Sequence, residues 1–303
     1  MTPAADTAQR RDISRATALA LFVVVIFAWG LNWPVTKLIV AEVTPLWTVA
    51  IRTAIACAVL FVVLRLSGQF IVPARGDVPV IIAIGLFHMV AFSALMAAGL
   101  KYVPAGRSVV LGYTTPLWVT PGAWLLLGET LPARRLAGIA IGLCGLLLLF
   151  NPAGFDWSDR QALFGNGLLL LSALSWSVSI LYVRAHRWTA TPFQLTFWQT
   201  LLATLVLTVL ASIFEPLPHP HWSAPLVLAF AYNVLIGTVL GFWAMAVVNR
   251  SVPATTTALG ILGTPIVGIA GSALALGETI DLTLIVATAL ILAGVAVGTT
   301  SRA

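Results

Sequence analysis

Few side chains in this sequence could carry chemistry, and those that could are surrounded by apolar residues. His88 and Arg52 each interrupt an apolar stretch, whereas the carboxylates of Glu42, Glu129 and Glu278 stand at the ends of such stretches. A histidine in apolar surroundings is a neutral packing residue, the polar lining of a cavity, or a group that exchanges protons near neutral pH. An arginine there is either an anchor for a helix end or a partner for the carboxylate of a bound molecule. The sequence leaves these alternatives open for both residues.

Aromatic residues accompany these polar ones at helical spacing. Trp29, Asn32 and Trp33 lie at positions i, i+3 and i+4, so they share one face of a helix. Deep aromatic residues mixed with a few polar groups are typical of a cavity that binds an amphiphilic small molecule. We therefore predict a binding cavity, with ordinary packing as the alternative for each single residue. The predicted lining is Trp29, Asn32, Trp33, Arg52, His88, Phe92, Tyr113, Trp176, Ser179, Gln199 and Trp243.

The residue patterns of known catalytic and metal sites are missing from the sequence. The four histidines form no HxxxH or HExxH pattern, and there is neither a phosphate-binding Walker loop nor a nucleophile elbow. Cys57 and Cys144 each lie within an apolar stretch, where we expect them to be buried small hydrophobic residues. The sequence therefore predicts no catalytic residues, no metal site and no cofactor.

The elements that must position these residues follow from the composition. Of the 303 residues, 60% are hydrophobic and 9% are charged, against about 45–50% and about 25% in a typical soluble domain. Such a chain is an integral membrane protein, and its continuous apolar runs favour helices over barrel strands. We predict an all-α protein with ten transmembrane helices, at residues 18–40, 45–66, 79–99, 105–127, 135–150, 164–184, 193–214, 225–247, 254–276 and 281–299.

Lys and Arg residues are distributed unequally between the two sides of the predicted bundle. With the N-terminus inside, eleven of the sixteen lie on the inner side, and the outer five are Lys37, Arg52, Lys101, Arg107 and Arg160. The positive-inside rule then predicts a multi-pass protein of the inner (plasma) membrane with both termini in the cytoplasm. Residues 1–17 are expected to be a cytoplasmic tail rather than a cleaved signal peptide. The net charge of +6 reflects this bias and does not indicate nucleic acid as a partner.

One segment of the sequence occurs twice. Residues 115–130 (TPLWVTPGAWLLLGET) and 264–279 (TPIVGIAGSALALGET) are identical at eight of sixteen positions, with an offset of 149 residues. An internal repeat of this kind indicates that the chain was built from two related halves.

The repeat extends beyond that segment and divides the chain. An offset of 147 residues aligns the first spans of the two halves, placing Arg184 at the position of Lys37. We predict one five-helix repeat at 18–150, a linker loop at 151–163 and a second repeat at 164–300. Because five is odd, the second repeat must enter the membrane from the opposite side, which gives two inverted halves around a central cavity.

Prolines and glycines mark further features of the repeats. Pro116 and Pro265 occupy equivalent positions, and each removes a backbone hydrogen bond within a span. A symmetric pair of bends would act as hinges, and static kinks are the alternative. The GxxxG motifs at 138–142 and 294–298 either pack the fifth helix on the tenth or join two chains. We therefore expect a monomer or a homodimer.

Several segments in a fixed order carry a family resemblance. They are WGLNWPVTKLI (29–39), IRTAIACAVL (51–60), the proline-led helix ending in LGE, the following RRLAGIAIGLCGLLLL, and a second copy of that unit at 264–298. Together they resemble the first, second, fourth and fifth helices of the EamA-type drug/metabolite transporters. The resemblance covers about residues 18–300, and within the family the chain looks most like the YddG-type amino-acid exporters.

The resemblance implies a secondary transporter, not an enzyme, that exports small metabolites by alternating access. Amino acids, including aromatic and other neutral ones, are the expected substrates, and membrane lipid is the other expected partner. Because no carboxylate lies in mid-span, we expect facilitated diffusion rather than coupling to an ion. One alternative is an organophosphate or nucleotide-sugar exchanger, which requires several buried cations. Another is an integral membrane enzyme or a structural protein.

Overall fold

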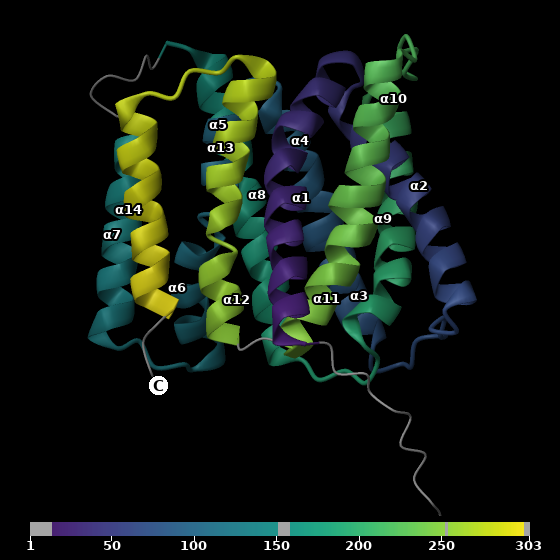
Figure 1. Cartoon of the computed structure of the whole chain (residues 1–303), viewed down its shortest axis with the longest axis horizontal. Coiled ribbons are helices and arrows are strands. Elements are labelled where there is room, and N and C mark those ends of the chain that lie inside the picture. The colour runs from purple at the N-terminus through teal and green to yellow at the C-terminus, as the bar shows by residue number, and fades with distance from the viewer. Residues whose placement is uncertain (1–13, 151–157, 252–253, 300–303) are drawn as a thin grey trace, which may run out of the picture.

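The computed structural model describes residues 14–150, 158–251 and 254–299, and every regular element within those ranges is a helix (Figure 1). The expected tail 1–17 and loop 151–163 fall mostly outside the described residues. The elements are α1 (Arg15–Glu42), α2 (Pro45–Leu66), α3 (Val78–Ala83), η1 (Ile84–Phe92), α4 (Ser93–Leu100), α5 (Ala105–Gly112), α6 (Thr115–Leu127), α7 (Ala133–Phe150), α8 (Arg160–Ala185), α9 (Pro192–Phe214), α10 (Ala224–Ala231), η2 (Tyr232–Leu240), α11 (Gly241–Ser251), α12 (Ala254–Gly260), α13 (Gly263–Leu276) and α14 (Leu282–Thr299).

Eight continuous stretches of helix among the described residues are long and apolar enough to cross a membrane. They coincide with eight of the ten predicted spans, and their ends differ from the predicted ones by four residues or fewer. The other two predicted spans, 105–127 and 254–276, are not continuous. Each is divided into two short helices, α5 with α6 and α12 with α13. The sequence predicted unbroken helices there, and the structure differs.

The two breaks lie at residues 113–114 and 261–262, and the offset of 149 residues places Tyr113 of the first break at Leu262 of the second. Each break comes just before a proline, Pro116 or Pro265. Proline has no N–H to donate to the preceding helical turn, so the ladder of backbone hydrogen bonds is interrupted there. At the first break the Thr115 hydroxyl donates instead to a carbonyl of that turn, at 2.9 Å. The sequence located the prolines, but it did not predict that each span would divide into two helices.

Two of the long spans contain a π-helical stretch in their middle, η1 and η2. A π-helix bonds residue i to residue i+5, so it holds more residues per turn and rotates the faces of the helix that follows. η1 packs against α8 and α9, and η2 packs against α1 and α2. Both stretches therefore lie against helices of the other half of the chain.

The helices α7 and α14 lie side by side along one edge of the bundle (Figure 1). Their glycines allow this approach. A Cβ added at Gly138 would lie 2.6 Å from the Gly294 carbonyl oxygen, and one added at Gly294 would lie 2.5 Å from the Gly138 carbonyl oxygen. The two GxxxG motifs therefore pack against each other within one chain.

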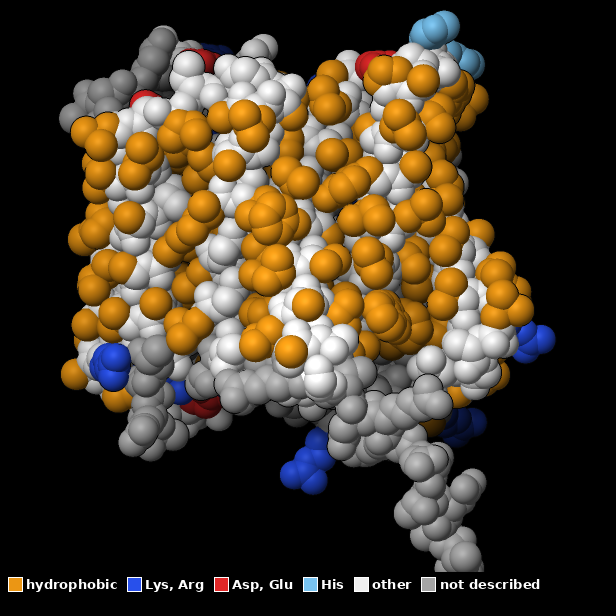
Figure 2. Space-filling view, viewed as in Figure 1, with side chains coloured by type: hydrophobic (Ala, Val, Ile, Leu, Met, Phe, Trp, Pro, Cys, Tyr) orange, Lys and Arg blue, Asp and Glu red, His pale blue; other side chains and the backbone are white. Residues whose placement is uncertain are grey.

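The face of the bundle seen in Figure 2 is apolar over most of its height, and charged side chains gather toward its two ends. Leu125 and Leu274 are among the exposed large hydrophobic residues of the bundle. α1 begins and α14 ends at the same end of the bundle (Figure 1). We call that end the terminus side and the opposite end the far side.

Candidate binding cavity

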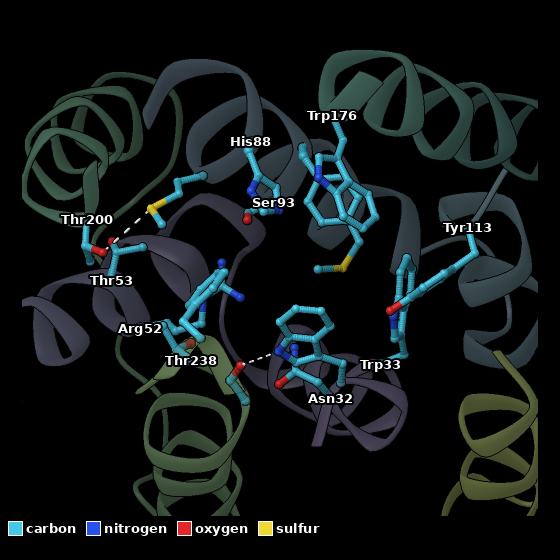
Figure 3. Close-up of a pocket in the computed structure, with 16 residues that line it drawn as sticks. Asn32, Trp33, Arg52, Thr53, His88, Ser93, Tyr113, Trp176, Thr200 and Thr238 are labelled. Carbon is cyan, nitrogen blue, oxygen red and sulfur yellow. Dashed lines mark hydrogen bonds between the residues drawn. The ribbon is translucent and has the colours of Figure 1, made fainter. Parts of the chain in front are cut away.

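A cavity that is partly open to solvent lies within the bundle (Figure 3). Both halves of the chain line it, through α1, α2, η1 and α4 from the first half and α8, α9, η2 and α11 from the second. Tyr113 enters from the break between α5 and α6. The lining is Trp29, Asn32, Trp33, Arg52, Thr53, His88, Met89, Phe92, Ser93, Met96, Tyr113, Trp176, Thr200, Gly237, Thr238 and Phe242.

The structure brings most of the predicted lining residues together. Around this cavity lie Trp29, Asn32, Trp33, Arg52, His88, Phe92, Tyr113 and Trp176. The other three lie elsewhere. Gln199 is buried and lines a neighbouring cavity, Ser179 is buried in α8 outside both linings, and Trp243 is 40% exposed on the surface of the bundle.

Trp176 forms the centre of an aromatic wall. Its ring is stacked on His88, with the centroids 5.1 Å apart and the planes 5° from parallel. Phe92 lies 5.1 Å from the Trp176 ring at a tilted angle, and Tyr113 meets it edge to face at 6.1 Å. Phe242 meets His88 edge to face at 6.3 Å. Such offset and edge-to-face arrangements are those that aromatic rings prefer, and they leave flat apolar surfaces toward the cavity.

Several polar side chains in the lining donate hydrogen bonds to backbone carbonyls. The Trp29 indole N–H donates to the Gly237 carbonyl at 3.1 Å, which joins α1 to η2. The hydroxyls of Thr53 and Thr200 donate to carbonyls one turn back in their own helices, at 2.9 and 2.7 Å. Their oxygens can still accept hydrogen bonds from a bound molecule.

Arg52 is the cation of the lining. Its Nε is buried and has no hydrogen-bond partner, and no ion pair among the described residues includes it. Figure 3 shows Arg52, Thr53 and Thr200 on one side of the cavity, facing Trp176 and Tyr113 across it. One wall is therefore polar and cationic, and the opposite wall is aromatic.

A second cavity continues from the first. It shares His88, Met89 and Phe242 with the central cavity, and its other lining residues include Trp188 and Asn249. Trp188 follows the end of α8 and Asn249 lies near the end of α11, and both helices end at the terminus side (Figure 1). The central cavity thus extends toward the terminus side.

The far side is held together by two charged residues from different helices. The Glu278 carboxylate accepts the backbone N–H groups of Ala105 and Gly106, at 2.6 and 2.9 Å. The Lys37 ammonium donates to the carbonyls of Leu100 and Val103, at 2.5 and 2.9 Å. An anion at a helix N-terminus and a cation at a helix C-terminus are both favourable positions. These bonds tie α1 and α13 to the corner between α4 and α5.

The terminus side has the equivalent residues in a different arrangement. Glu129 and Arg184 occupy the repeat positions of Glu278 and Lys37. They bind each other, with N and O 2.5 Å apart, and Glu129 also pairs with Arg135 at 3.3 Å.

Asp77 holds a loop on the terminus side. Its carboxylate accepts the backbone N–H of Thr189 at 2.8 Å and that of Ala190 at 3.4 Å, and it also accepts from the Thr189 hydroxyl and the Ala74 N–H. The Thr189 N–H, followed by the other donors, lowers the pKa of Asp77 below its usual value. This carboxylate joins the start of α3 to the segment before α9.

Sequence reasoning missed part of the lining, and some signals for it were present. Thr53 and Thr200 are repeat equivalents at an offset of 147 residues. Phe242 lines the cavity where Trp243 was expected, because η2 directly precedes these residues and rotates the helix face. Within the described parts of the chain, no cluster of metal-ligating side chains is found.

The fold and the cavity define a multi-span helical membrane protein with a polar and aromatic binding cavity that both halves of the chain build. The model of the EamA-like transporter family matches residues 16–151 and again residues 163–300. The chain is therefore a member of the EamA-like transporter family, with two copies of the family unit.

Several known proteins are similar along most of their length. The transporter YoaV of Bacillus subtilis is 25% identical, over 89% of this chain and 92% of its own. Proteins named probable amino-acid metabolite efflux pump are 29% identical in Salmonella typhimurium, over 91% of this chain and 92% of that protein, and 28% in Escherichia coli, over 86% of each. One crystal structure shares the fold, with a TM-score of 0.64 and 22% identity, over 94% of this chain and 96% of that one.

Proposed function

We propose that this transporter exports small metabolites, with neutral and aromatic amino acids as substrates, through the central cavity. The cavity carries the proposal, because its mixture of aromatic and polar walls suits a small amphiphilic molecule. The relatives named as amino-acid metabolite efflux pumps support this substrate class. The proposed location is the inner membrane, with the terminus side facing the cytoplasm.

We infer further that the chain crosses the membrane ten times as two inverted five-helix repeats. The broken pairs α5–α6 and α12–α13 would supply the fourth and ninth crossings, in addition to the eight continuous spans. Non-helical backbone at membrane depth is tolerated where protein buries it, and Tyr113 at the first break is buried. Pro116 and Pro265 would act as hinges at these breaks.

The repeat-related glutamates support alternating access. In this structure Glu278 binds the N-terminus of α5, and the cavity extends to the terminus side. In the opposite state, Glu129 would leave Arg184 and bind the N-terminus of α12 near Ala254, the repeat equivalent of Ala105. Two similar sets of bonds, of which one is made at a time, give two conformations of comparable free energy.

Reciprocal variants test this switch. In a protein whose Cys57 and Cys144 are replaced, a cysteine at Ser93 reports access to the cavity from each side of the membrane. Glu278→Gln should increase labelling from the far side, because it weakens the bonds that close that side. Glu129→Gln, the matched variant of the other repeat, should decrease it. If the two variants shift labelling in the same direction, the switch does not operate as proposed.

We propose that the substrate moves down its own concentration gradient, without coupling to an ion. No Asp or Glu is part of the cavity lining, so a carboxylate that could carry a proton or sodium ion through the centre is missing from it. An organophosphate or nucleotide-sugar exchanger is less favoured, because such a substrate requires several cations and only Arg52 lines the cavity. No enzymatic step or cofactor is part of the proposal.

Flux into proteoliposomes of the purified chain tests the function. A panel of labelled amino acids should identify at least one that crosses faster than into protein-free vesicles. Trp176→Ala should reduce that flux, whereas Trp243→Ala, which removes an exposed indole outside the cavity, should leave it unchanged. Absence of flux with every amino acid and small metabolite in the panel would remove the exporter proposal.

A further inference from the structure

The cavity contains a cation without a counter-charge, and this feature extends the proposed function to a substrate class. Arg52 lies seven residues after Pro45 in α2, about 10 Å below the far end of that helix at about 1.5 Å per residue. Its Nε is buried without a hydrogen-bond partner. A charged side chain at membrane depth normally pairs with another group or marks a substrate pathway.

Among the residues that the structure describes, none supplies an anion for Arg52. None of the lining residues is an Asp or Glu, and the other ionisable groups of the lining are His88 and Tyr113. The described carboxylates that make ion pairs or cap helices, such as Glu129, Glu278 and Asp77, lie at the ends of the bundle. The cavity lining therefore carries one positive charge, at Arg52, that no described carboxylate pairs with.

The opposite wall is suited to a flat apolar body. Trp176 and Phe92 present ring surfaces there, with His88 stacked on Trp176. A carboxylate bound to Arg52 would place a ring at the end of a short chain against this wall. Stacking and burial would then hold the ring, while the ion pair holds the charged end.

An ammonium group finds hydrogen-bond acceptors in the Thr53 and Thr200 hydroxyls, but no counter-charge in the lining. The Asn32 side-chain oxygen lines the cavity and lacks a hydrogen-bond partner, but the atom is buried against Gly237, where an added Cβ would lie 2.5 Å from it. With no carboxylate in the lining, the positive end of an amino acid would lose hydration without gaining an ion pair.

We propose that the cavity recognises aromatic carboxylates as anions, through Arg52 and the aromatic wall, and that an amino group on the substrate is not required. This inference rests on the proposed role of the cavity as the transport site. It implies that a monocarboxylate without an amine moves one negative charge per transport event. The membrane potential, negative inside, would then drive such anions out of the cell.

Three ligands that carry the same ring separate the contribution of the carboxylate to binding from that of the amino group. They are 3-phenylpropionate, phenylalanine and phenethylamine. Binding to the purified protein can be followed by the fluorescence of the cavity tryptophans, or by calorimetry. We expect the acid to bind at least as tightly as phenylalanine, and the amine about 10- to 100-fold more weakly, because hydrogen bonds to charged groups carry about that difference. Equal binding of the amine and the acid would overturn the inference without any variant being needed.

Variants of Arg52 locate the anion site. Arg52→Gln should weaken binding of 3-phenylpropionate by about 10- to 100-fold, and Arg52→Lys should restore part of it. Arg107→Gln is the matched control, because Arg107 also has buried nitrogens without partners but does not line the cavity. If Arg107→Gln weakens binding as much as Arg52→Gln, the effect is a general one of lost charge and the site is misassigned.

Flux under an imposed potential tests the charge movement. In proteoliposomes with a potassium diffusion potential, the equilibrium distribution of 3-phenylpropionate should change about tenfold for about 60 mV, and that of phenylalanine should not change. If the flux of 3-phenylpropionate does not depend on the membrane potential, the inference is overturned. If phenylalanine is carried but the acid is not, the exporter proposal stands and this inference fails. If the whole panel of metabolites gives no flux, the exporter proposal fails with it.

Discussion

The contact between α7 and α14 predicts opposite effects for two glycines one turn apart. Gly294→Ala places a Cβ 2.5 Å from the carbonyl oxygen of Gly138 and 2.5 Å from the N of Gly142, which are backbone atoms of the facing helix. Gly298→Ala, in the same helix, places a Cβ with no described atom within 4 Å. The two variants make the same chemical change, and among the described residues only the Cβ added at Gly294 meets another backbone.

The magnitude follows from two terms. Replacing a helical glycine by alanine gains up to about 1 kcal/mol of helix propensity in both variants. Forcing an extra methyl group into a filled contact costs about 1–3 kcal/mol, and only Gly294→Ala carries this cost. Both variants gain the helix-propensity term, so it cancels in the comparison. Gly294→Ala should therefore be about 1–3 kcal/mol less stable than Gly298→Ala. Gly298→Ala should be as stable as the wild type or slightly more stable.

Thermal and denaturant unfolding of the detergent-solubilised protein can measure the difference. Gly138→Ala, which would put a Cβ 2.6 Å from the Gly294 carbonyl oxygen, should resemble Gly294→Ala. The double variant should lose less than the sum of the two, because the helices need to move apart only once. If Gly298→Ala is destabilised as much as Gly294→Ala, the close helix contact is not the cause and the reasoning fails.

Three further outcomes are expected. Because the pKa of Asp77 is lowered in the folded protein, its contribution to stability is complete above the unfolded value of about 3.9 and is lost as the pH falls through the folded pKa. Asp77→Asn should therefore lower the melting temperature at pH 7, and the gap to the wild type should close on acidification; a gap that widens in acid would contradict this. Reporter fusions after Arg187 should give a cytoplasmic signal and fusions at His219 an external one, and the reverse result would invert the proposed orientation. His88→Gln should leave the response of amino-acid flux to a pH gradient unchanged, since uniport is proposed; accumulation driven by a pH gradient in the wild type and abolished in this variant would show that His88 carries protons.

The spans and the repeat were readable from the sequence because both depend on local properties. A helix must be apolar over the thickness of the bilayer, so composition and length locate the eight continuous spans to within four residues. The position of Trp29, Asn32 and Trp33 on one face follows from helical geometry alone, and these residues do line the cavity. The repeated segment and the family motifs were likewise contained in the order of residues.

Which face of a helix meets the cavity was decided by the tertiary structure. The π-helical stretch η2 rotates the start of α11, so Phe242 enters the cavity and Trp243 faces outward. Gln199 looks equally polar and equally deep in the sequence, yet its helix turns it into the neighbouring cavity. Periodicity specifies which residues share a face, but the rotation of that face depends on the helices packed around it.

Glu129 and Glu278 show most directly what the sequence determines and what the tertiary structure decides. Glu129 and Glu278 both stand in the sequence LGET, at equivalent positions of the two repeats. Glu278 binds the N-terminus of α5, and Glu129 binds Arg184 and Arg135. A repeated sequence specifies the same chemical groups twice, but in this conformation of the bundle the two glutamates bind different partners. The difference therefore belongs to the tertiary packing, because a hydrogen bond depends on distances that residues far apart in the chain must set together.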